Sequence, residues 1–223
     1  MIVAIDGPSG AGKSTVSKAV AKELGFSCLD TGAMYRAIAW RALHDDIDLG
    51  NDEALGVLAR DHVIDFGHVE GDPVPRRVFI DGIDITDAIR TAQIDRSVST
   101  VSAVPAVREA LVDQQRRIGS NGNFVVEGRD IGTVVFPQAE VKIFLTASAE
   151  ERARRRGQQN EGRQVGSIDY KEVLADIVRR DELDSARSAS PLRPAEDALR
   201  IDSTDRSLAD IIAMIADQVR VRM

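Results

Sequence analysis

Short apolar runs alternate along this chain with stretches whose apolar positions repeat at helical spacing. The runs predict five buried strands, at residues 1–5, 27–29, 124–127, 141–145 and 199–202. The amphipathic or alanine-rich stretches predict helices at residues 14–24, 35–43, 105–118, 146–156, 170–183 and 207–219. Buried strands that alternate with helices are typical of a parallel sheet covered on both faces, so we expect an α/β fold.

The pattern changes within residues 63–86. Two short β-type runs, 78–80 and 83–85, flank the dipeptide Asp81-Gly82, which is typical of a tight hairpin turn. We therefore expect a small antiparallel piece inserted into the otherwise alternating chain.

Composition describes an ordinary globular chain of 223 residues, 43% hydrophobic and 29% charged. No run approaches the roughly 20 apolar residues of a membrane helix, and the first apolar stretch ends at Asp6. We expect neither a membrane span nor a secretory signal. The single Cys28 excludes an internal disulfide framework, and three scattered histidines argue against a histidine-based metal site. These counts favour a cytoplasmic location.

The net charge of −7 argues against binding to a DNA or RNA polymer, which normally requires a basic surface. Arginine nevertheless makes up 24 of the 29 basic residues. Arginine binds phosphate with two parallel hydrogen bonds, which lysine cannot do. Codon usage in a GC-rich genome is an equally good explanation of the total, so the positions of the arginines matter more.

A glycine-rich segment between the first strand and the first helix carries the strongest chemical signal. It reads Gly7, Pro8, Ser9, Gly10, Ala11, Gly12, Lys13, Ser14 and Thr15, and it matches the phosphate-loop pattern in the required strand–helix context. In such a loop, backbone N–H groups and the helix N-terminus bind phosphate oxygens. Lys13 can reach the β- and γ-phosphates of ATP, and the Ser14 hydroxyl can bind Mg²⁺.

A phosphate loop indicates a nucleotide but not a reaction. A small-molecule or nucleotide kinase, a GTPase switch and an ATP-driven motor subunit all use one. The guanine-recognition pattern Asn-Lys-x-Asp is absent from the sequence, and motor subunits usually carry domains that this chain would barely hold. The kinase class remains.

The segment Asp30 to Arg36 follows the second strand, whose carboxyl end opens onto the ligand crevice in a doubly wound sheet. Thr31, Tyr35 and Arg36 offer a hydroxyl, a phenol and a guanidinium that could bind a second phosphate. An ordinary capped helix start is the alternative.

The segment Glu127 to Asp130 ends the third core strand. Here Arg129 could bind an acceptor phosphate, and Asp130 could accept a hydrogen bond from a base. A salt-bridged turn would explain the same pair.

Arg152, Arg155 and Arg156 share a helical face and precede a Gly/Gln/Asn-rich stretch, residues 157–166. A basic flap over the ATP phosphates would offset charge and exclude water. A solvated helix with internal ion pairs is the alternative.

Arg180 and Arg187 lie on one side of a predicted helix together with Asp184, four residues after Arg180. They could contribute to the same site, or form a salt-bridged face without function.

These segments together resemble the bacterial cytidylate kinases, which transfer the γ-phosphoryl group of ATP to CMP or dCMP. The resemblance is carried by GPSGAGKST (7–15), DTGAMYR (30–36), VFIDGIDIT (78–86), SAVPAVREAL (102–111), EGRDIGTVVFP (127–137), KIFLTASAEERARRR (142–156), RRDELDSAR (179–187) and DST (202–204). These stretches run in order from end to end, so the match is far more specific than the phosphate loop alone.

The resemblance implies a P-loop NTPase fold with a doubly wound five-stranded parallel sheet, an inserted acceptor-binding subdomain and a short lid. Residues 1–35, 105–150 and 167–223 would form the ATP-binding core, 36–104 the CMP-binding insert and 151–166 the lid.

The resemblance also assigns roles to individual residues. Gly7 to Thr15, with Arg152, Arg155 and Arg156 from the lid, would bind ATP, and Ser14 would bind Mg²⁺. CMP would contact Thr31, Tyr35, Arg36, Ser99, Arg108, Arg129, Asp130, Arg180, Asp184 and Arg187. Within this set, Ser99, Arg108 and Asp130 would recognise cytosine, whose edge offers one amino donor and two acceptors. Asp184 would accept a ribose hydroxyl.

Two positions depart from the family pattern. Glu127 stands where an aspartate is common, which leaves its role beside magnesium open. Thr31 replaces a common serine but keeps the hydroxyl.

The expected reaction is in-line phosphoryl transfer between ATP and CMP held end to end. Lys13, Arg129, Arg180 and Arg187 would act with Mg²⁺ to offset the charge. No general base is required, because the acceptor is already an anionic phosphate oxygen. We expect a monomer acting on small nucleotides. A kinase for UMP or for a non-nucleotide acid, and a nucleotide sensor without turnover, stay open as alternatives.

Overall fold

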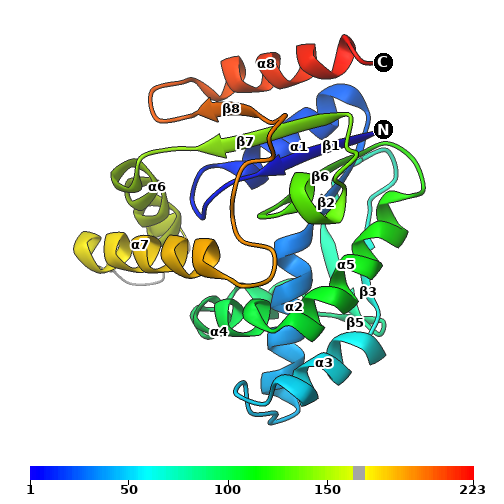
Figure 1. Cartoon of the computed structure of the whole chain (residues 1–223), viewed down its shortest axis with the longest axis vertical. Helices are drawn as coiled ribbons and strands as arrows, with labels where there is room; N and C mark the ends of the chain where they lie inside the picture. Colours follow the sequence, from blue (N-terminus) through cyan, green and yellow to red (C-terminus); the bar gives the residue numbers. More distant parts are fainter. Residues whose placement is uncertain (163–168) are drawn as a thin grey trace.

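The computed structural model of the chain describes residues 1–162 and 169–223. Five parallel strands form the central sheet in the order β2-β6-β1-β7-β8, which is the expected doubly wound parallel arrangement. The strands are β1 (Ile2–Asp6), β2 (Ser27–Asp30), β6 (Phe124–Gly128), β7 (Val141–Thr146) and β8 (Leu199–Asp202). All five strands that the apolar runs predict are present (Figure 1).

Alternate residues of each strand face opposite sides of the sheet, and each side has its own core. Val3 and Ile5 pack with α1 (Lys13–Leu24) and α8 (Leu208–Arg220). Ala4, between them in the sequence, faces the core formed with α2 (Thr31–His44) and α5 (Pro105–Gly119). Because both faces are covered there, the central strands β1 and β6 are buried along most of their length, whereas the edge strand β8 is largely exposed.

The second core continues into the part of the chain inserted between β2 and β6 (Figure 1). Three antiparallel strands lie there, in the order β3 (Ile64–Gly67), β4 (Arg77–Ile80) and β5 (Ile83–Asp84). The predicted hairpin is confirmed at Asp81-Gly82, where both residues have positive φ. The helices α3 (Asp52–Asp61) and α4 (Ala92–Ala103) complete this insert, and neither was expected.

Helices α6 (Ala149–Gly162) and α7 (Tyr170–Ala186) form an arm that projects from the core (Figure 1). They share a small apolar cluster of Ala153, Val173 and Ile177. Residues 163–166 of the expected lid lie outside the described residues, and the division into core, insert and lid stays a prediction.

Two predicted helix starts are wrong. The helix expected from Tyr35 begins at Thr31, because the Asp30 carboxylate caps it by accepting a hydrogen bond from the Ala33 amide at 3.0 Å. The helix expected from Thr146 begins at Ala149, since Thr146 still pairs with β8. Ser148 provides the cap there by accepting from the Glu151 amide.

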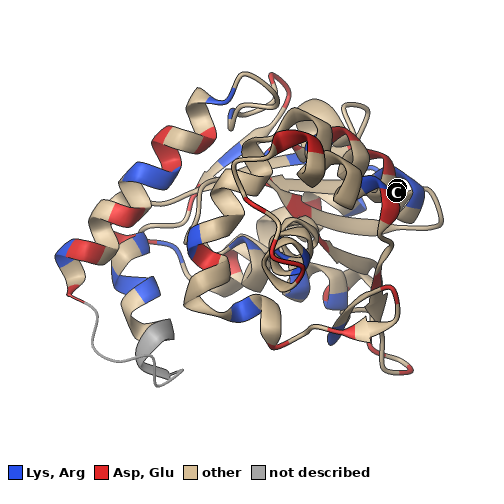
Figure 2. Ribbon diagram, turned by 90° about the horizontal axis from the view of Figure 1, so that it is seen from below, with Lys and Arg blue, Asp and Glu red and all other residues tan. Residues whose placement is uncertain are grey.

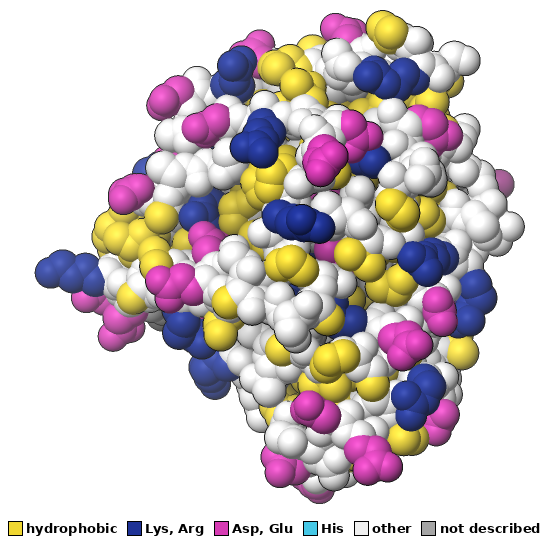
Figure 3. Space-filling view, in the orientation of Figure 1, with side chains coloured by type: hydrophobic (Ala, Val, Ile, Leu, Met, Phe, Trp, Pro, Cys, Tyr) yellow, Lys and Arg dark blue, Asp and Glu magenta, His cyan; other side chains and the backbone are white. Residues whose placement is uncertain are grey.

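Acidic and basic residues are interspersed over the helices, and neither sign dominates a whole face in the views shown (Figures 2 and 3). None of the helices described is both long and apolar enough to cross a membrane.

Candidate functional site

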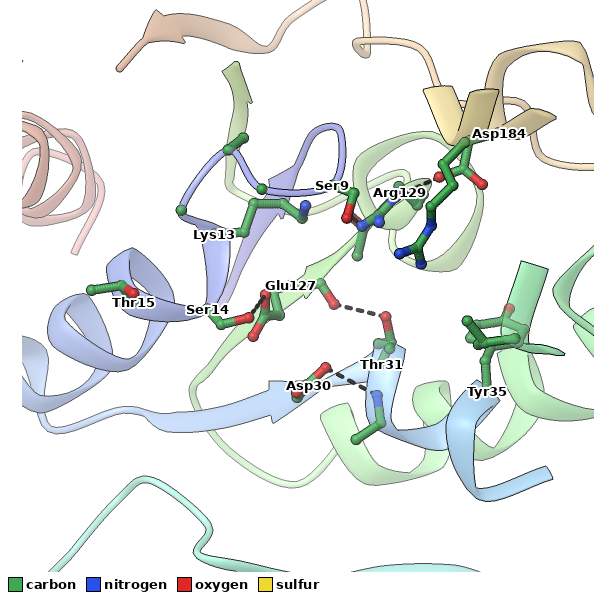
Figure 4. A pocket seen from close by; sticks show the side chains of 18 of the residues that line it. Ser9, Lys13, Ser14, Thr15, Asp30, Thr31, Tyr35, Glu127, Arg129 and Asp184 are labelled. Atoms are coloured by element: carbon green, nitrogen blue, oxygen red, sulfur yellow. Dashed lines mark hydrogen bonds and ion pairs between the residues drawn. The ribbon is translucent and has the colours of Figure 1, made fainter. Parts of the chain in front are cut away.

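A cavity of about 810 Å³ opens at the carboxyl ends of β1, β2 and β6, where core, insert and arm face one another. This is the crevice position that a doubly wound sheet offers to ligands. Residues from α1, α2, α4, α5, α6 and α7 line it, so the site is assembled from segments far apart in the sequence (Figure 4).

The glycine-rich loop forms one wall of the cavity. Gly10 and Gly12 have φ values of 79° and 91°, which only glycine adopts readily, so the backbone curls as a phosphate loop requires. Lys13 is buried, and its Nζ donates to the Pro8 carbonyl at 2.7 Å. Burial and the nearby Arg129 lower the pKa of Lys13 to about 7. An anionic phosphate beside the amine would favour its charged form again.

A carboxylate and a hydroxyl meet beside this loop. The Ser14 hydroxyl donates to Glu127 Oε2 at 2.8 Å, while the buried Oε1 has no hydrogen-bond partner among the described residues (Figure 4). Burial raises the pKa of Glu127 to about 7, and Asp30 adds to the shift. Mg²⁺ prefers oxygen ligands such as a carboxylate oxygen without another partner. It usually completes its coordination shell with waters and phosphate oxygens. Ser14 and Glu127 therefore fit a magnesium ion.

The opposite wall carries a buried ion pair from α5 and the turn after β6. Arg108 donates to Asp130 at 2.5 Å, and both side chains are nearly inaccessible to solvent. The guanidinium also donates to the Ser102 carbonyl and lies 5.2 Å from the centre of the Tyr35 ring. These contacts fix a donor and an acceptor side by side, as recognition of a base edge requires.

A second cluster links the turn after β6 to α7. Arg129 donates to Asp184 at 2.8 Å, and Arg187 donates both to the same carboxylate and to the Ser102 hydroxyl. Burial opposes ionisation of Asp184, but Arg129 and Arg187 hold its pKa below the usual range. Arg180 is buried and forms no hydrogen bond or ion pair with the side chains described, those of residues 1–158 and 169–223. Its guanidinium lines the cavity, where an anionic ligand could bind it.

Helix α6 of the arm places two arginines on the cavity wall. Arg156 pairs with Asp95 at 2.7 Å, and Arg155 donates to Ser203 and Glu151. Arg152 instead ties the arm to the loop, because it donates to the Ser9 carbonyl at 3.1 Å.

Most residues expected from the sequence line this one cavity. They are Ser9, Gly10, Ala11, Gly12, Lys13, Ser14, Thr15, Thr31, Tyr35, Arg36, Ser99, Arg108, Arg129, Asp130, Arg155, Arg156, Arg180, Asp184 and Arg187. Gly7, Pro8 and Arg152 do not line it. Gly7 is needed for close packing, since a Cβ there would lie 1.9 Å from the Leu145 carbonyl oxygen.

The cavity wall also contains residues that the sequence did not single out. Lys18 lies one helical turn after Ser14 on α1, a spacing that could have revealed it. Asp30 ends a core strand, which is a comparable signal. Ser203 lies in the DST segment that carries the family resemblance, whereas Asp95 carries no local signal.

The arrangement suits two phosphorylated ligands that meet in one space. Backbone amides and Lys13 would hold one phosphate chain, and the arginines would hold a second anion. The Arg108–Asp130 pair lies on the wall away from the phosphate loop and offers recognition of a base.

Comparisons with known proteins agree with this geometry. The sequence profile of the cytidylate kinase family matches residues 3–221. A cytidylate kinase of Desulfitobacterium hafniense is 49% identical over 213 residues, which cover 96% of this chain and 90% of that protein. A cytidylate kinase of Pseudomonas fluorescens is 45% identical over 222 residues, which cover 99% and 96% of the two chains.

The fold has a counterpart among solved structures. An uncharacterized protein from Eubacterium ventriosum superposes with a TM-score of 0.52 at 12% sequence identity, covering 99% of this chain and 98% of the other. At that identity the likeness concerns the fold alone.

Proposed function

Because this chain belongs to the cytidylate kinase family, we propose that it transfers the γ-phosphoryl group of ATP to CMP or dCMP. The products are ADP and CDP or dCDP. The single observation that carries the proposal is that the phosphate loop and the buried Arg108–Asp130 pair line the same cavity. Donor and acceptor can therefore be held end to end.

On the donor side, the amides of Gly10 to Thr15 bind the ATP phosphates, and Lys13 places its charge at the β- and γ-phosphates. Arg155 and Arg156 approach from the arm. Their position on the cavity wall supports this role. Arg152 contributes indirectly, by holding the arm against the Ser9 carbonyl.

On the acceptor side, Asp130 accepts a hydrogen bond from the cytosine amino group, and Arg108 donates to the ring acceptors. Ser99 lies on the same wall. Asp184 accepts from a ribose hydroxyl. Thr31, Tyr35 and Arg36 contact the CMP phosphate.

Catalysis depends on how the two nucleotides are positioned and on how the negative charge of their phosphates is stabilised. Arg129, Arg180 and Arg187 all line the cavity. In the proposed reaction they stabilise the charge that moves from one phosphate to the other. No side chain has to remove a proton, because the attacking oxygen is anionic. Ser14 and Glu127 would hold Mg²⁺, which supplies further charge neutralisation at the ATP phosphates.

We propose that residues 151–166, which begin in α6 of the arm, act as a lid, that residues 36–104 hold the acceptor, and that residues 1–35, 105–150 and 167–223 form the core. The protein would act as a cytoplasmic monomer on free nucleotides. The contact between the arm and the insert at Asp95 supports the lid.

An acceptor panel tests the function. ADP release is measured with ATP, Mg²⁺ and, in turn, CMP, dCMP, UMP, AMP and a non-nucleotide acid such as shikimate. We expect the highest kcat/KM with CMP or dCMP. A higher value with UMP or shikimate would assign a different kinase. Tight ATP binding without acceptor-dependent turnover would indicate a nucleotide sensor.

A further inference from the structure

Asp6, the last residue of β1, lies almost completely buried at the centre of the sheet and does not line the cavity. Its Oδ1 accepts a hydrogen bond from the Ile131 amide at 2.8 Å, and its Oδ2 accepts from the Gly132 amide at 2.8 Å. The carboxylate therefore joins two segments that are separated in the sequence by 125 and 126 residues.

The two amides belong to the π-helical turn Ile131–Val135, which follows Asp130 directly. The first N–H groups of any helical turn lack acceptors within the turn itself. Left unpaired in a buried position, each would cost free energy. Asp6 supplies both acceptors from another strand.

Burial raises the pKa of Asp6 to about 6, although both amide hydrogen bonds act in the opposite direction. The carboxylate is thus ionised at neutral pH. A buried charge is costly unless its hydrogen bonds are satisfied. The two hydrogen bonds that this carboxylate accepts offset that cost.

The segment that Asp6 holds begins with Arg129 and Asp130, two residues that we assign to CMP. Asp6 pairs in register with Gly128, the residue just before them. The packing is tight as well, since a Cβ on Gly128 would lie 2.6 Å from Ile131 Cδ1. Asp6 is also the chain neighbour of Gly7, where the phosphate loop starts.

We propose that Asp6 is a positioning residue for the acceptor nucleotide: by holding the amides of Ile131 and Gly132 it sets the positions of Arg129 and Asp130 relative to the phosphate loop. This inference rests on the proposed function. Asp6 itself touches neither nucleotide.

Asp6→Asn tests the inference, because it keeps the shape and one acceptor but turns an N–H donor toward the second amide. We expect KM for CMP to rise on the order of tenfold, the usual effect of losing a charge-assisted hydrogen bond. The preference for CMP over UMP should fall as Asp130 loses its fixed place. KM for ATP should change much less.

Asp48→Asn is the matched control. Asp48 accepts a hydrogen bond from the Gly50 amide at 2.9 Å in a loop that lines no part of the cavity. The same chemical change there should leave both KM values and the CMP preference unaltered. None of these three quantities depends on the fraction of enzyme that is folded, so partial unfolding of a variant does not change the result.

The inference would be overturned if Asp6→Asn had the same KM for CMP and the same CMP preference as the wild type. Equal rises in KM for ATP and for CMP would overturn it too. Absence of CMP turnover in the wild type would instead overturn the proposed function. If Asp6→Asn does not fold, hydrogen exchange on the wild type replaces it. Saturating CMP should then slow exchange of the Ile131 and Gly132 amides but not of Gly50. Unchanged exchange at all three would overturn the inference.

Discussion

Arg156 of the arm and Asp95 of the insert form an ion pair with a distance of 2.7 Å between guanidinium nitrogen and carboxylate oxygen. The other oxygen of Asp95 accepts a hydrogen bond from Arg36 at 2.5 Å. Burial opposes ionisation of Asp95, but Arg36 and Arg156 hold its pKa below the usual range. The Asp95 carboxylate thus links Arg156, which we propose binds ATP, to Arg36, which we propose binds CMP.

Asp95→Ala should lower the free energy of unfolding by about 1–2 kcal/mol. The pair is only partly exposed, so it is worth more than a surface ion pair, yet solvent still screens it. Urea denaturation measures the difference. Asp113→Ala makes the same change at an exposed position of α5 with no hydrogen bond among the described residues, and it should cost less than half as much. Equal effects would show that Asp95 does not join the arm to the insert.

Asp130→Asn should shift the base preference toward UMP. Cytosine offers an amino donor where uracil has a carbonyl acceptor, and the asparagine amide can donate to that carbonyl. We expect the ratio of kcat/KM for CMP to that for UMP to fall roughly 10- to 100-fold, as the loss of one charged hydrogen bond allows. Steady-state kinetics with both nucleotides measure the ratio. An unaltered ratio would remove Asp130 from base recognition.

Glu127 should make the magnesium requirement depend on pH. Burial raises its pKa to about 7, so the carboxyl is largely protonated at pH 6 and ionised at pH 8. Because only the carboxylate attracts a cation, the Mg²⁺ concentration for half-maximal rate should fall roughly tenfold from pH 6 to pH 8.

Glu127→Gln is the comparison for this pH effect, because ATP itself titrates in the same range and contributes equally to both proteins. The variant should need more Mg²⁺ at pH 8 and show a flatter pH dependence. Parallel pH profiles for the two proteins would contradict a role of Glu127 beside the metal.

The sequence predicts the sheet and the donor side of the site because both depend on local patterns. Five apolar runs correspond to the five core strands, and the spacing of Gly7, Gly12 and Lys13 defines the phosphate loop. The arginines at 129, 180 and 187 could be assigned from the family resemblance, since each lies in a matching segment.

Local patterns could not predict the contacts that organise the site. Asp95 reaches Arg36 across 59 positions, and Asp6 reaches Gly132 across 126. The residues that neighbour each aspartate in the sequence do not predict which distant residue it contacts. Arg152 shares a helical face with Arg155 and Arg156, which favours an ATP contact, yet its guanidinium donates to the Ser9 carbonyl and pairs with Asp181.

We propose that ATP and CMP occupy one cavity at the same time. Calorimetric titration with a bisubstrate analogue, adenosine and cytidine joined at their 5′ positions through a chain of phosphates, tests it most directly. We predict one molecule bound per protein, at least about 100-fold more tightly than CMP alone, with Lys13→Ala and Asp130→Asn each weakening binding in a protein that still melts cooperatively. Affinity no greater than that of CMP, or affinity indifferent to either substitution, would contradict the claim.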